Sequence, residues 1–344
     1  MSREVEAAIV RLVRRNLQKG GSLSVSWFGG EPLMQMDIIE RLSRSFIQIC
    51  TNAEANYSAS IITNGYLLNK ANTDKLIAWK VDDAQVTLDG PPEIHDQRRI
   101  HKGGQRTFSK ILDNVKEAAQ RLKISLRMNV DESNKGYIQE MMDIVVHEGL
   151  GKKVGFYLGQ TYPYTEVCQD ITDQCLMDQE FSLLGLQTLL RLVRDGFPYT
   201  FWMPASRSNF CTADKENSFV ITPSGGIVNC WNETTTRGKE IGHLLKPCTK
   251  RMKQNAKEWR RHNPFEREEC VKCLLLPICL GGCPYMYQLT GKVDCHKWIH
   301  NLRESLAVYY YYKVAERERK IIHHIYEAAE AVKKLKEMST LKSQ

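Results

Sequence analysis

The chain lacks a long apolar segment. No run of about 18 or more apolar residues occurs among its 344 residues, which excludes an ordinary membrane-spanning helix. The opening segment MSREVEAAIVRLVRR is charged and amphipathic, and no apolar core with small residues after it is present, which excludes a secretory signal. We therefore expect a cytoplasmic protein without a membrane partner.

The chain also lacks a strong excess of charge of one sign. Its net charge of +8 is mild for this length, and Lys and Arg alternate with Asp and Glu along most of the sequence. A dedicated nucleic-acid surface needs basic residues gathered on one face. We therefore expect no nucleic-acid partner and interpret the basic excess as solvated surface.

Cysteine, by contrast, is abundant: the chain has eleven, and seven of them fall between Cys211 and Cys295. In a chain without a secretory signal, clustered cysteines indicate a metal protein more often than a disulfide scaffold. The other four are scattered, at Cys50, Cys168, Cys175 and Cys248. We expect Cys50, on a helix, and Cys248, in a loop, to be buried apolar residues rather than ligands.

The spacing of the seven cysteines favours iron–sulfur clusters. A C-x13-G-x4-C pattern joins Cys211 to Cys230, a C-x2-C-x5-C-x3-C run joins Cys270 to Cys283, and Cys295 follows after eleven more residues. Four thiolates around zinc normally come from about two C-x2-C pairs, and here only one such pair exists. Clusters accept less regular spacing because their ligands bind separate iron atoms. Structural zinc and disulfides are the alternatives.

The first half alternates predicted strands with predicted helices, which indicates β-α units and a parallel sheet. A polar or glycine-containing loop follows each strand, and the carboxyl ends of parallel strands are where ligands bind. The expected strands are 23–28, 58–63, 84–90, 124–130 and 153–159, and the expected helices are 2–17, 38–50, 71–79, 108–122, 137–148, 180–194 and 301–338.

Together with the cysteine pattern, four motifs resemble the radical S-adenosylmethionine (SAM) enzymes that carry a C-terminal SPASM domain. The motifs are WFGGEPL at 27–33, ITNGYLL at 62–68, VTLDGPPEIHDQRR at 86–99 and RMNV at 127–130. The resemblance implies an α/β fold: a partial parallel (β/α)6 TIM-like barrel lacking its first strand over residues 1–200, a small Cys-rich SPASM domain over 204–300, and a C-terminal helix and tail over 301–344.

The same resemblance assigns the seven cysteines to two auxiliary 4Fe-4S clusters. The ligands of one cluster look like Cys270, Cys273, Cys279 and Cys295, and those of the other look like Cys211, Cys230 and Cys283. The latter set is one thiolate short, because the segment PASRSNF before Cys211 contains no cysteine. Its fourth ligand can be Cys168, Cys175, the substrate or solvent.

The resemblance also implies a SAM site at the strand ends. The expected contacts are Gly29, Gly30 and Glu31 with the ammonium group, Arg127 with the carboxylate, and Thr87 and Asp89 with the ribose hydroxyls. The alternatives are an ordinary turn at 29–31, an outward-facing Arg127, and a strand end that caps its own turn at 87–89. The loop after this strand end carries four polar residues, His95, Asp96, Arg98 and Arg99. These residues either contact the substrate or are only exposed to solvent.

SPASM members of the family mostly modify peptides or proteins, so the resemblance implies a peptide or protein substrate and a low-potential electron donor of the flavodoxin or ferredoxin type. In sulfatase-maturing relatives an Asp follows the second cysteine of the first pair, whereas here Trp231 follows Cys230. That departure favours ribosomal peptide maturation over an anaerobic sulfatase-maturase-like activity.

One motif of the family is missing from this sequence. The family cleaves SAM with a third, catalytic 4Fe-4S cluster, whose ligands form a C-x3-C-x2-C loop between the first strand and the first helix. No such spacing occurs here. Because the chain begins at a helix, we expect a truncated enzyme that is inactive in this form, with the missing strand and loop encoded just upstream. The alternatives are a non-catalytic iron–sulfur or peptide-binding relative and a zinc-bound interaction domain.

Overall fold

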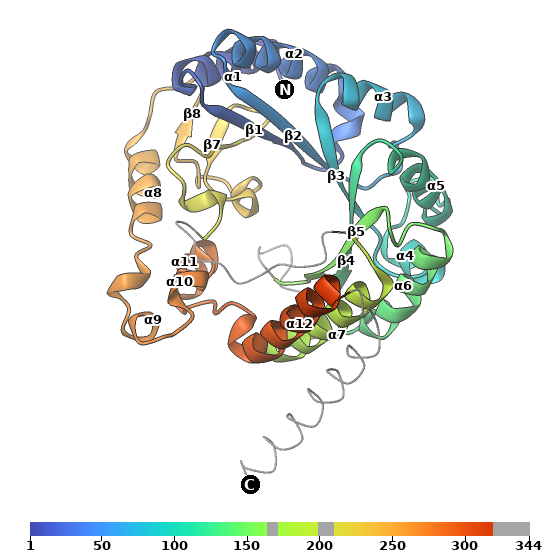
Figure 1. Cartoon of the computed structure of the whole chain (residues 1–344). Helices are drawn as coiled ribbons and strands as arrows, with labels where there is room; N and C mark the ends of the chain where they lie inside the picture. The colour runs from blue at the N-terminus through green and yellow to red at the C-terminus, as the bar shows by residue number, and fades with distance from the viewer. Residues whose placement is uncertain (164–170, 199–209, 319–344) are drawn as a thin grey trace.

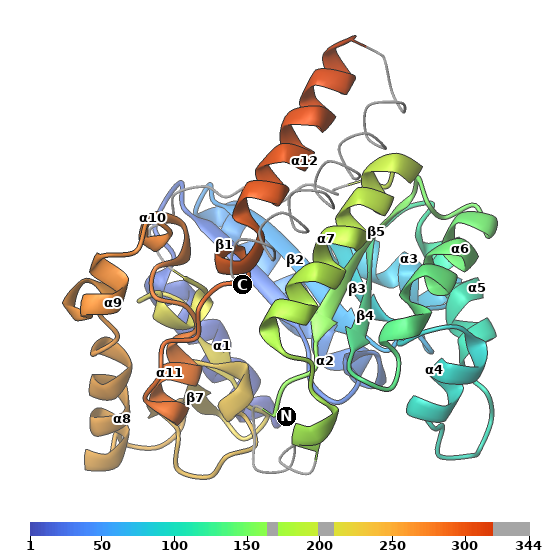
Figure 2. The ribbon, with the colours of Figure 1, turned by 90° about the horizontal axis from the view of Figure 1, so that it is seen from below.

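The computed structural model describes residues 1–163, 171–198 and 210–318. Figure 1 shows them arranged around a ring, with a curved sheet and its helices on one side and a cysteine-rich part with a smaller sheet on the other. Seen from below, the helices of the cysteine-rich part lie on the opposite side of the molecule from the helices between residues 70 and 147 (Figure 2).

The large sheet has five parallel strands, which follow one another in space in the same order as in the sequence. This arrangement confirms the predicted α/β architecture, and every strand lies within three residues of its predicted range. The strands are β1 (Ser22–Trp27), β2 (Asn56–Thr63), β3 (Val81–Thr87), β4 (Lys123–Val130) and β5 (Val154–Gln160).

Helices between the strands lie on the outside of the ring (Figure 1). The hydroxyl of Ser2 caps the first helix by accepting a hydrogen bond from the backbone N–H of Val5 at 3.3 Å, as the sequence indicates. The helices of this part are α1 (Arg3–Asn16), α2 (Met36–Asn52), α3 (Lys70–Ala78), α4 (Pro92–Arg98), α5 (Phe108–Ala118), α6 (Ile138–His147) and α7 (Asp178–Asp195).

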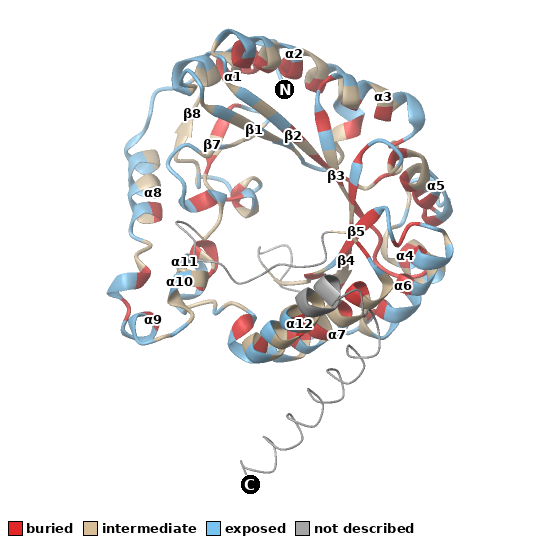
Figure 3. Ribbon diagram, viewed as in Figure 1, coloured by how far each residue is buried: buried red, intermediate tan, exposed pale blue. Residues whose placement is uncertain are grey.

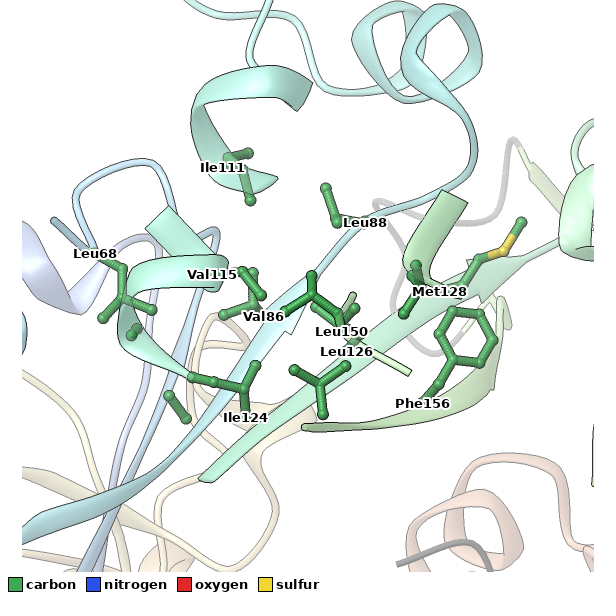
Figure 4. Close-up of a cluster of buried hydrophobic side chains, with 14 of the residues drawn as sticks. Leu68, Val86, Leu88, Ile111, Val115, Ile124, Leu126, Met128, Leu150 and Phe156 are labelled. Carbon is green, nitrogen blue, oxygen red and sulfur yellow. The ribbon is translucent and has the colours of Figure 1, made fainter. Parts of the chain in front are cut away.

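Alternation along the strands separates an apolar outer face from a polar inner face. On β4, Leu126 and Met128 are fully buried in the cluster of apolar side chains between the sheet and its helices (Figure 4). The neighbouring Arg127 and Asn129 are only partly buried and lie on the opposite, concave face. Figure 3 shows the buried residues concentrated where strands and helices meet. The concave face is therefore free to carry polar chemistry.

The cysteine-rich part contains little regular structure and a small apolar core. Its three-stranded sheet is antiparallel, and its core consists of Ala213, Cys230, Trp259, Tyr285 and Met286. The elements are β6 (Val220–Ile221), β7 (Gly226–Val228), β8 (Gly242–His243), α8 (Lys250–Arg260), α9 (Glu268–Val271), α10 (Leu276–Cys279) and α11 (Pro284–Thr290).

The last described helix, α12 (Trp298–Glu318), packs against α7 and joins the cysteine-rich part back to the first half. It begins three residues before the predicted helix 301–338, and residues 319–344 lie outside the described part. None of the helices in the described ranges is long and apolar enough to cross a membrane.

The segment after β3 differs from the predicted solvated or substrate-facing loop. Its residues form α4, and His95 of that helix is completely buried, with Nδ1 accepting a hydrogen bond from the backbone N–H of Asp89 at 3.1 Å. Because Nδ1 is an acceptor, the neutral ring carries its proton on Nε2. Nε2 is buried and has no hydrogen-bond partner among the described residues. The imidazole is therefore a structural element of the strand end rather than a surface group.

We predict that His95 makes the fold sensitive to acid. Burial lowers the pKa of His95 from 6.5 to about 4. Between these pH values the unfolded chain binds a proton at this position that the folded chain excludes, so stability falls as the pH drops from 6.5 to 4. The loss attributable to this group is at most about 3 kcal/mol.

Urea unfolding at several pH values measures this effect in the intact chain and in the variant His95→Gln, whose amide oxygen can still accept from Asp89. The free energy of unfolding should decline less steeply with acid in the variant than in the unmodified chain. Equal declines would show that His95 does not carry the acid sensitivity.

Candidate functional site

Glu31 ties together the carboxyl ends of β1 and β2. Its Oε1 accepts hydrogen bonds from the backbone N–H of Leu33 at 3.0 Å and from the hydroxyl of Thr63 at 2.7 Å. Its Oε2 accepts from the backbone N–H of Asn64 at 2.8 Å. The carboxylate thereby fixes the loop after β1 against the end of β2 and caps the short 3-10 helix η1 (Pro32–Gln35).

The glycine pair before Glu31 borders open space. Gly29 has φ of +152°, a conformation that L side chains rarely adopt. A Cβ built on either Gly29 or Gly30 would meet no atom within 4 Å. The backbone of this loop is therefore accessible to a small ligand. The predicted role of Gly29, Gly30 and Glu31 in holding the SAM ammonium group fits this geometry and stays a prediction.

Asp89 joins the ends of β3 and β4. Only 4% of this residue is exposed, and its Oδ2 accepts from Nε of Arg99 at 2.7 Å. Its Oδ1 accepts from the backbone N–H and the side-chain amide of Asn129 at 2.9 and 3.1 Å. Both carboxylate oxygens thus have protein partners, and a ribose hydroxyl would be an additional one. Thr87, the other predicted ribose contact, is 8% exposed.

Arg127 lies on the concave face of the sheet, as the SAM prediction requires and unlike the outward-facing alternative. Its Nε donates to Oδ1 of Asn129 at 2.8 Å, and the guanidinium rests on the backbone of Gly159 in β5. A Cβ at Gly159 would come within 2.4 Å of that Nε, so a glycine is needed there for Arg127 to take this position. Asn129 connects Arg127 to Asp89, which makes one polar network along the strand ends.

The remaining polar residues of α4 and the loop after it hold the fold together. Asp96 accepts hydrogen bonds from the backbone N–H groups of Thr107 and Phe108, at the start of α5. Arg98 forms an ion pair with Asp131 at 2.6 Å, and Arg99 contacts Asp89 as described above. The expectation of a solvated loop is therefore wrong for this group, because residues 92–98 form a helix and these polar side chains have protein partners. Contact with a substrate stays a prediction.

The structure brings Cys211, Cys230 and Cys283 together in the core of the cysteine-rich part, where they interact electrostatically. Burial, together with the nearby Cys283 and Cys211 thiolates, raises the pKa of Cys230 to about 12. Thiols in such a place ionise only with a compensating cation, and a metal supplies one. Tyr162, just after β5, packs against this set and so places it next to the large sheet.

The other four cysteines of the run form a second set. Burial raises the pKa of Cys295, and the thiolates of Cys279, Cys270 and Cys273 raise it further, in that order. Cys295 is exposed and Cys273 partly exposed, so this set lies near the surface. This grouping into three and four cysteines is compatible with the ligand sets that the resemblance implies, and the ligand assignment stays a prediction.

The other cysteines fall outside both sets. Cys50 is 2% exposed, as predicted, whereas Cys248 is exposed and not a buried apolar residue. The thiol of Cys175 donates to the carbonyl oxygen of Ile171 at 3.3 Å, and Cys168 lies outside the described residues. Within the described ranges, no group of three or more His, Cys, Asp or Glu side chains is arranged to hold a single metal ion.

Sequence reasoning missed several charged residues next to the cysteines. Asp294 lies beside Cys283, whose backbone N–H donates to its carboxylate, and burial raises the pKa of Asp294 to about 6. Arg267 and His262 lie against each other beside Cys270. The sequence does show that each of these charged residues lies near a cysteine of the run. Which thiol each one contacts depends on how the loops fold, and the sequence does not show this.

The sequence of this chain is similar to a known family model and to several known proteins. Residues 3–145 match the family model described as the Radical SAM superfamily. The PqqA peptide cyclase of Granulibacter bethesdensis is 22% identical over 283 residues, which cover 80% of this chain and 73% of that protein. A cysteine-type anaerobic sulfatase-maturating enzyme of Clostridium perfringens is 25% identical over 297 residues, which cover 79% of this chain and 77% of that protein.

Solved structures share the fold. The native anSMEcpe with bound AdoMet superposes with a TM-score of 0.67 at 18% identity, over 90% of each chain. Streptococcus suis SuiB bound to the precursor peptide SuiA superposes with a TM-score of 0.54 at 15% identity, over 86% of this chain and 68% of that one. At these identities the likeness shows a common fold.

We predict that the two cysteine sets lose iron separately. After anaerobic reconstitution, Cys273→Ala and Cys211→Ala should each retain about four of the about eight irons expected per chain, because each substitution removes a ligand of one cluster. Cys248→Ala, an exposed cysteine outside both sets, serves as the control and should keep all the iron. If Cys273→Ala and Cys211→Ala left the iron content unchanged, the ligand assignment would be wrong.

Proposed function

We infer, from the radical SAM domain that residues 3–145 form, that this chain binds SAM and iron–sulfur clusters and acts on a peptide or protein substrate. The domain match confirms the resemblance drawn from the sequence. We assign SAM to the carboxyl edge of the large sheet and two auxiliary 4Fe-4S clusters to residues 204–300, the proposed SPASM domain.

The observation that carries this proposal is a contact between the two halves of the molecule. The rings of Phe28 and Trp231 meet edge to face, with centroids 5.9 Å apart and planes at 75°. Phe28 directly precedes the Gly29–Gly30 loop, and Trp231 directly follows Cys230. The contact therefore holds the three-cysteine set beside the loop that we assign to SAM.

The residues present fit SAM and clusters in three respects. Open space lies beside Gly29 and Gly30, which leaves room for a ligand next to the Glu31 carboxylate. Arg127, on the concave face, offers a cation to the carboxylate of an amino acid moiety. The cysteines gather in two sets that the cluster assignment explains. When bound, a catalytic cluster and SAM supply a 5′-deoxyadenosyl radical in this family.

Peptide maturation is the activity that we favour. One curated relative is named a PqqA peptide cyclase, and SuiB was solved with its precursor peptide, so peptide substrates are known among the similar proteins. Trp231 is 53% exposed beside the partly exposed Phe28, which leaves an aromatic surface between the two proposed cofactor sites for a substrate side chain. A reducing compartment such as the cytoplasm would keep the cysteines available as ligands.

A sulfatase-maturase-like activity is the second candidate. The Clostridium perfringens relative carries that name at 25% identity. The residue after Cys230 weighs against this activity. Sulfatase-maturing relatives have an Asp at this position, and the indole of Trp231 cannot replace it as a proton acceptor. The third candidate function is that of a non-catalytic relative, which binds clusters or peptides without radical chemistry.

We predict that Glu31→Ala and Arg127→Ala each weaken SAM binding. Loss of one charge-assisted contact costs about 1.5–3 kcal/mol, which corresponds to about a tenfold to hundredfold lower affinity. Equilibrium dialysis with labelled SAM measures this change in the reconstituted chain to which a segment with the C-x3-C-x2-C motif has been added, so that the catalytic cluster is present. Glu40→Ala is the matched control, because Glu40 forms an exposed ion pair with Arg44 on α2 and should leave the affinity unchanged. Unaltered affinity in both test variants would place these residues outside the site.

Peptide modification is tested by mass spectrometry of a precursor peptide encoded beside the gene. The sequence has no C-x3-C-x2-C, so the reconstituted chain is compared with a version extended at its N-terminus by a strand and loop that carry this motif. With SAM and a low-potential reductant, the extended version should release 5′-deoxyadenosine and change the peptide mass, while the shorter chain should do neither. Absence of 5′-deoxyadenosine from the extended version would favour the non-catalytic relative.

A further inference from the structure

A buried arginine lies beside the four-cysteine set. Arg267 is 9% exposed and directly precedes α9, the short helix that carries Cys270. The carbonyl oxygen of Arg267 accepts a hydrogen bond from the backbone N–H of Cys270 at 3.0 Å. Burial raises the pKa of the Cys270 thiol, and the nearby Arg267 guanidinium acts in the opposite direction. A cation thus faces a cysteine that we assign to a cluster.

The guanidinium of Arg267 is held in place from several sides. Its Nη2 lies 3.0 Å from Nδ1 of His262, which follows α8. Its central carbon lies 3.5 Å from the centroid of the Tyr287 ring on α11. A Cβ at Gly281 would lie 3.3 Å from Nη1, so the glycine lets the chain pass close over the group. The position of the charge is therefore fixed by elements that are distant in the sequence.

The same guanidinium has a donor without a partner. Within residues 1–163, 171–198 and 210–318, Nη1 of Arg267 is buried and makes no hydrogen bond, and no carboxylate forms an ion pair with this side chain. A buried cation without a counter-charge is unfavourable unless an anion compensates it. A cluster with four thiolate ligands is such an anion, and its sulfur atoms accept hydrogen bonds.

The three-cysteine set has neighbours of the opposite charge. Next to it lie the carboxyl groups of Asp214 beside Cys211, Glu233 beside Cys230 and Asp294 beside Cys283. Near the four-cysteine set, Glu269 and Asp294 contribute acidic groups as well, and Arg267 adds a buried cation.

We propose that Arg267 raises the reduction potential of the cluster held by Cys270, Cys273, Cys279 and Cys295. The inference rests on the two clusters of the proposed function. Reduction adds one negative charge to a cluster, and a nearby buried cation with an N–H group that has no protein partner stabilises the added charge. His262 and Tyr287 are positioning residues in this account, because they fix the guanidinium.

Redox titration of the reconstituted full-length chain, followed by electron paramagnetic resonance, tests the proposal. In Arg267→Gln one of the two midpoint potentials should become more negative and the other should stay unchanged. Arg267→Lys keeps the charge but not the planar set of donors, and its potential should lie between those of the intact chain and Arg267→Gln. Lys272→Gln is the control, since it removes one charge two residues from Cys270 at a side chain that is 73% exposed.

The iron content separates failure of this inference from failure of the proposed function. A reconstituted intact chain without clusters would overturn the proposed function, whereas intact clusters with the same midpoint potential in Arg267→Gln and Lys272→Gln would overturn only the role of Arg267. If Arg267→Gln lost its iron, the intact chain labelled with a nitrogen isotope in its arginine guanidinium groups would decide. A hyperfine coupling of that nitrogen to the reduced cluster supports the contact, and its absence contradicts it.

Discussion

On the cluster assignment proposed above, the fold of the cysteine-rich part depends on the clusters that its thiolates bind. Its described apolar core contains only five buried residues, Ala213, Cys230, Trp259, Tyr285 and Met286, and its strands are two or three residues long. A core of this size stabilises little structure by itself, and ligand binding to several loops at once is the usual remedy in small domains. Burial also raises the pKa of the cysteines, so without a metal they are neutral thiols that connect nothing. The cluster assignment thus explains both the chemistry and the stability of this part.

The large sheet has the opposite character, because its rim is set by the protein's own hydrogen bonds. Glu31 links the ends of β1 and β2, and Asp89 links the ends of β3 and β4. Asn129 extends the second link to Arg127, so the groups that we assign to SAM are held before any ligand arrives. Preorganised donors and acceptors need little rearrangement on binding. The contact of Phe28 with Trp231 then joins this rigid rim to the part that depends on its ligands.

Sequence reasoning was reliable where a periodic pattern decides the structure. The alternation Ile-Ser-Leu-Arg-Met-Asn-Val places Arg127 and Asn129 on one face of β4, and the structure agrees. The same reasoning missed α4, since the Pro91–Pro92 pair that ends the strand also starts the helix, and it therefore treated the buried His95 as a loop residue. It also missed Arg267, whose partners His262 and Tyr287 come together only through the folded loops. The alternation of apolar and polar residues along a short segment predicts a strand and the face on which each side chain lies. A polar network depends on contacts between segments that are distant in the sequence, and no local pattern predicts these contacts.

The central claim is that the seven cysteines hold two separate four-iron clusters in the cysteine-rich part of the molecule. Anomalous diffraction at the iron absorption edge, from crystals of the anaerobically reconstituted chain, tests it most directly. The account predicts two strong iron peaks, one among Cys211, Cys230 and Cys283 and one among the other four cysteines of the run. A signal at the zinc edge in the same places, or a single iron peak shared by both sets, would contradict it.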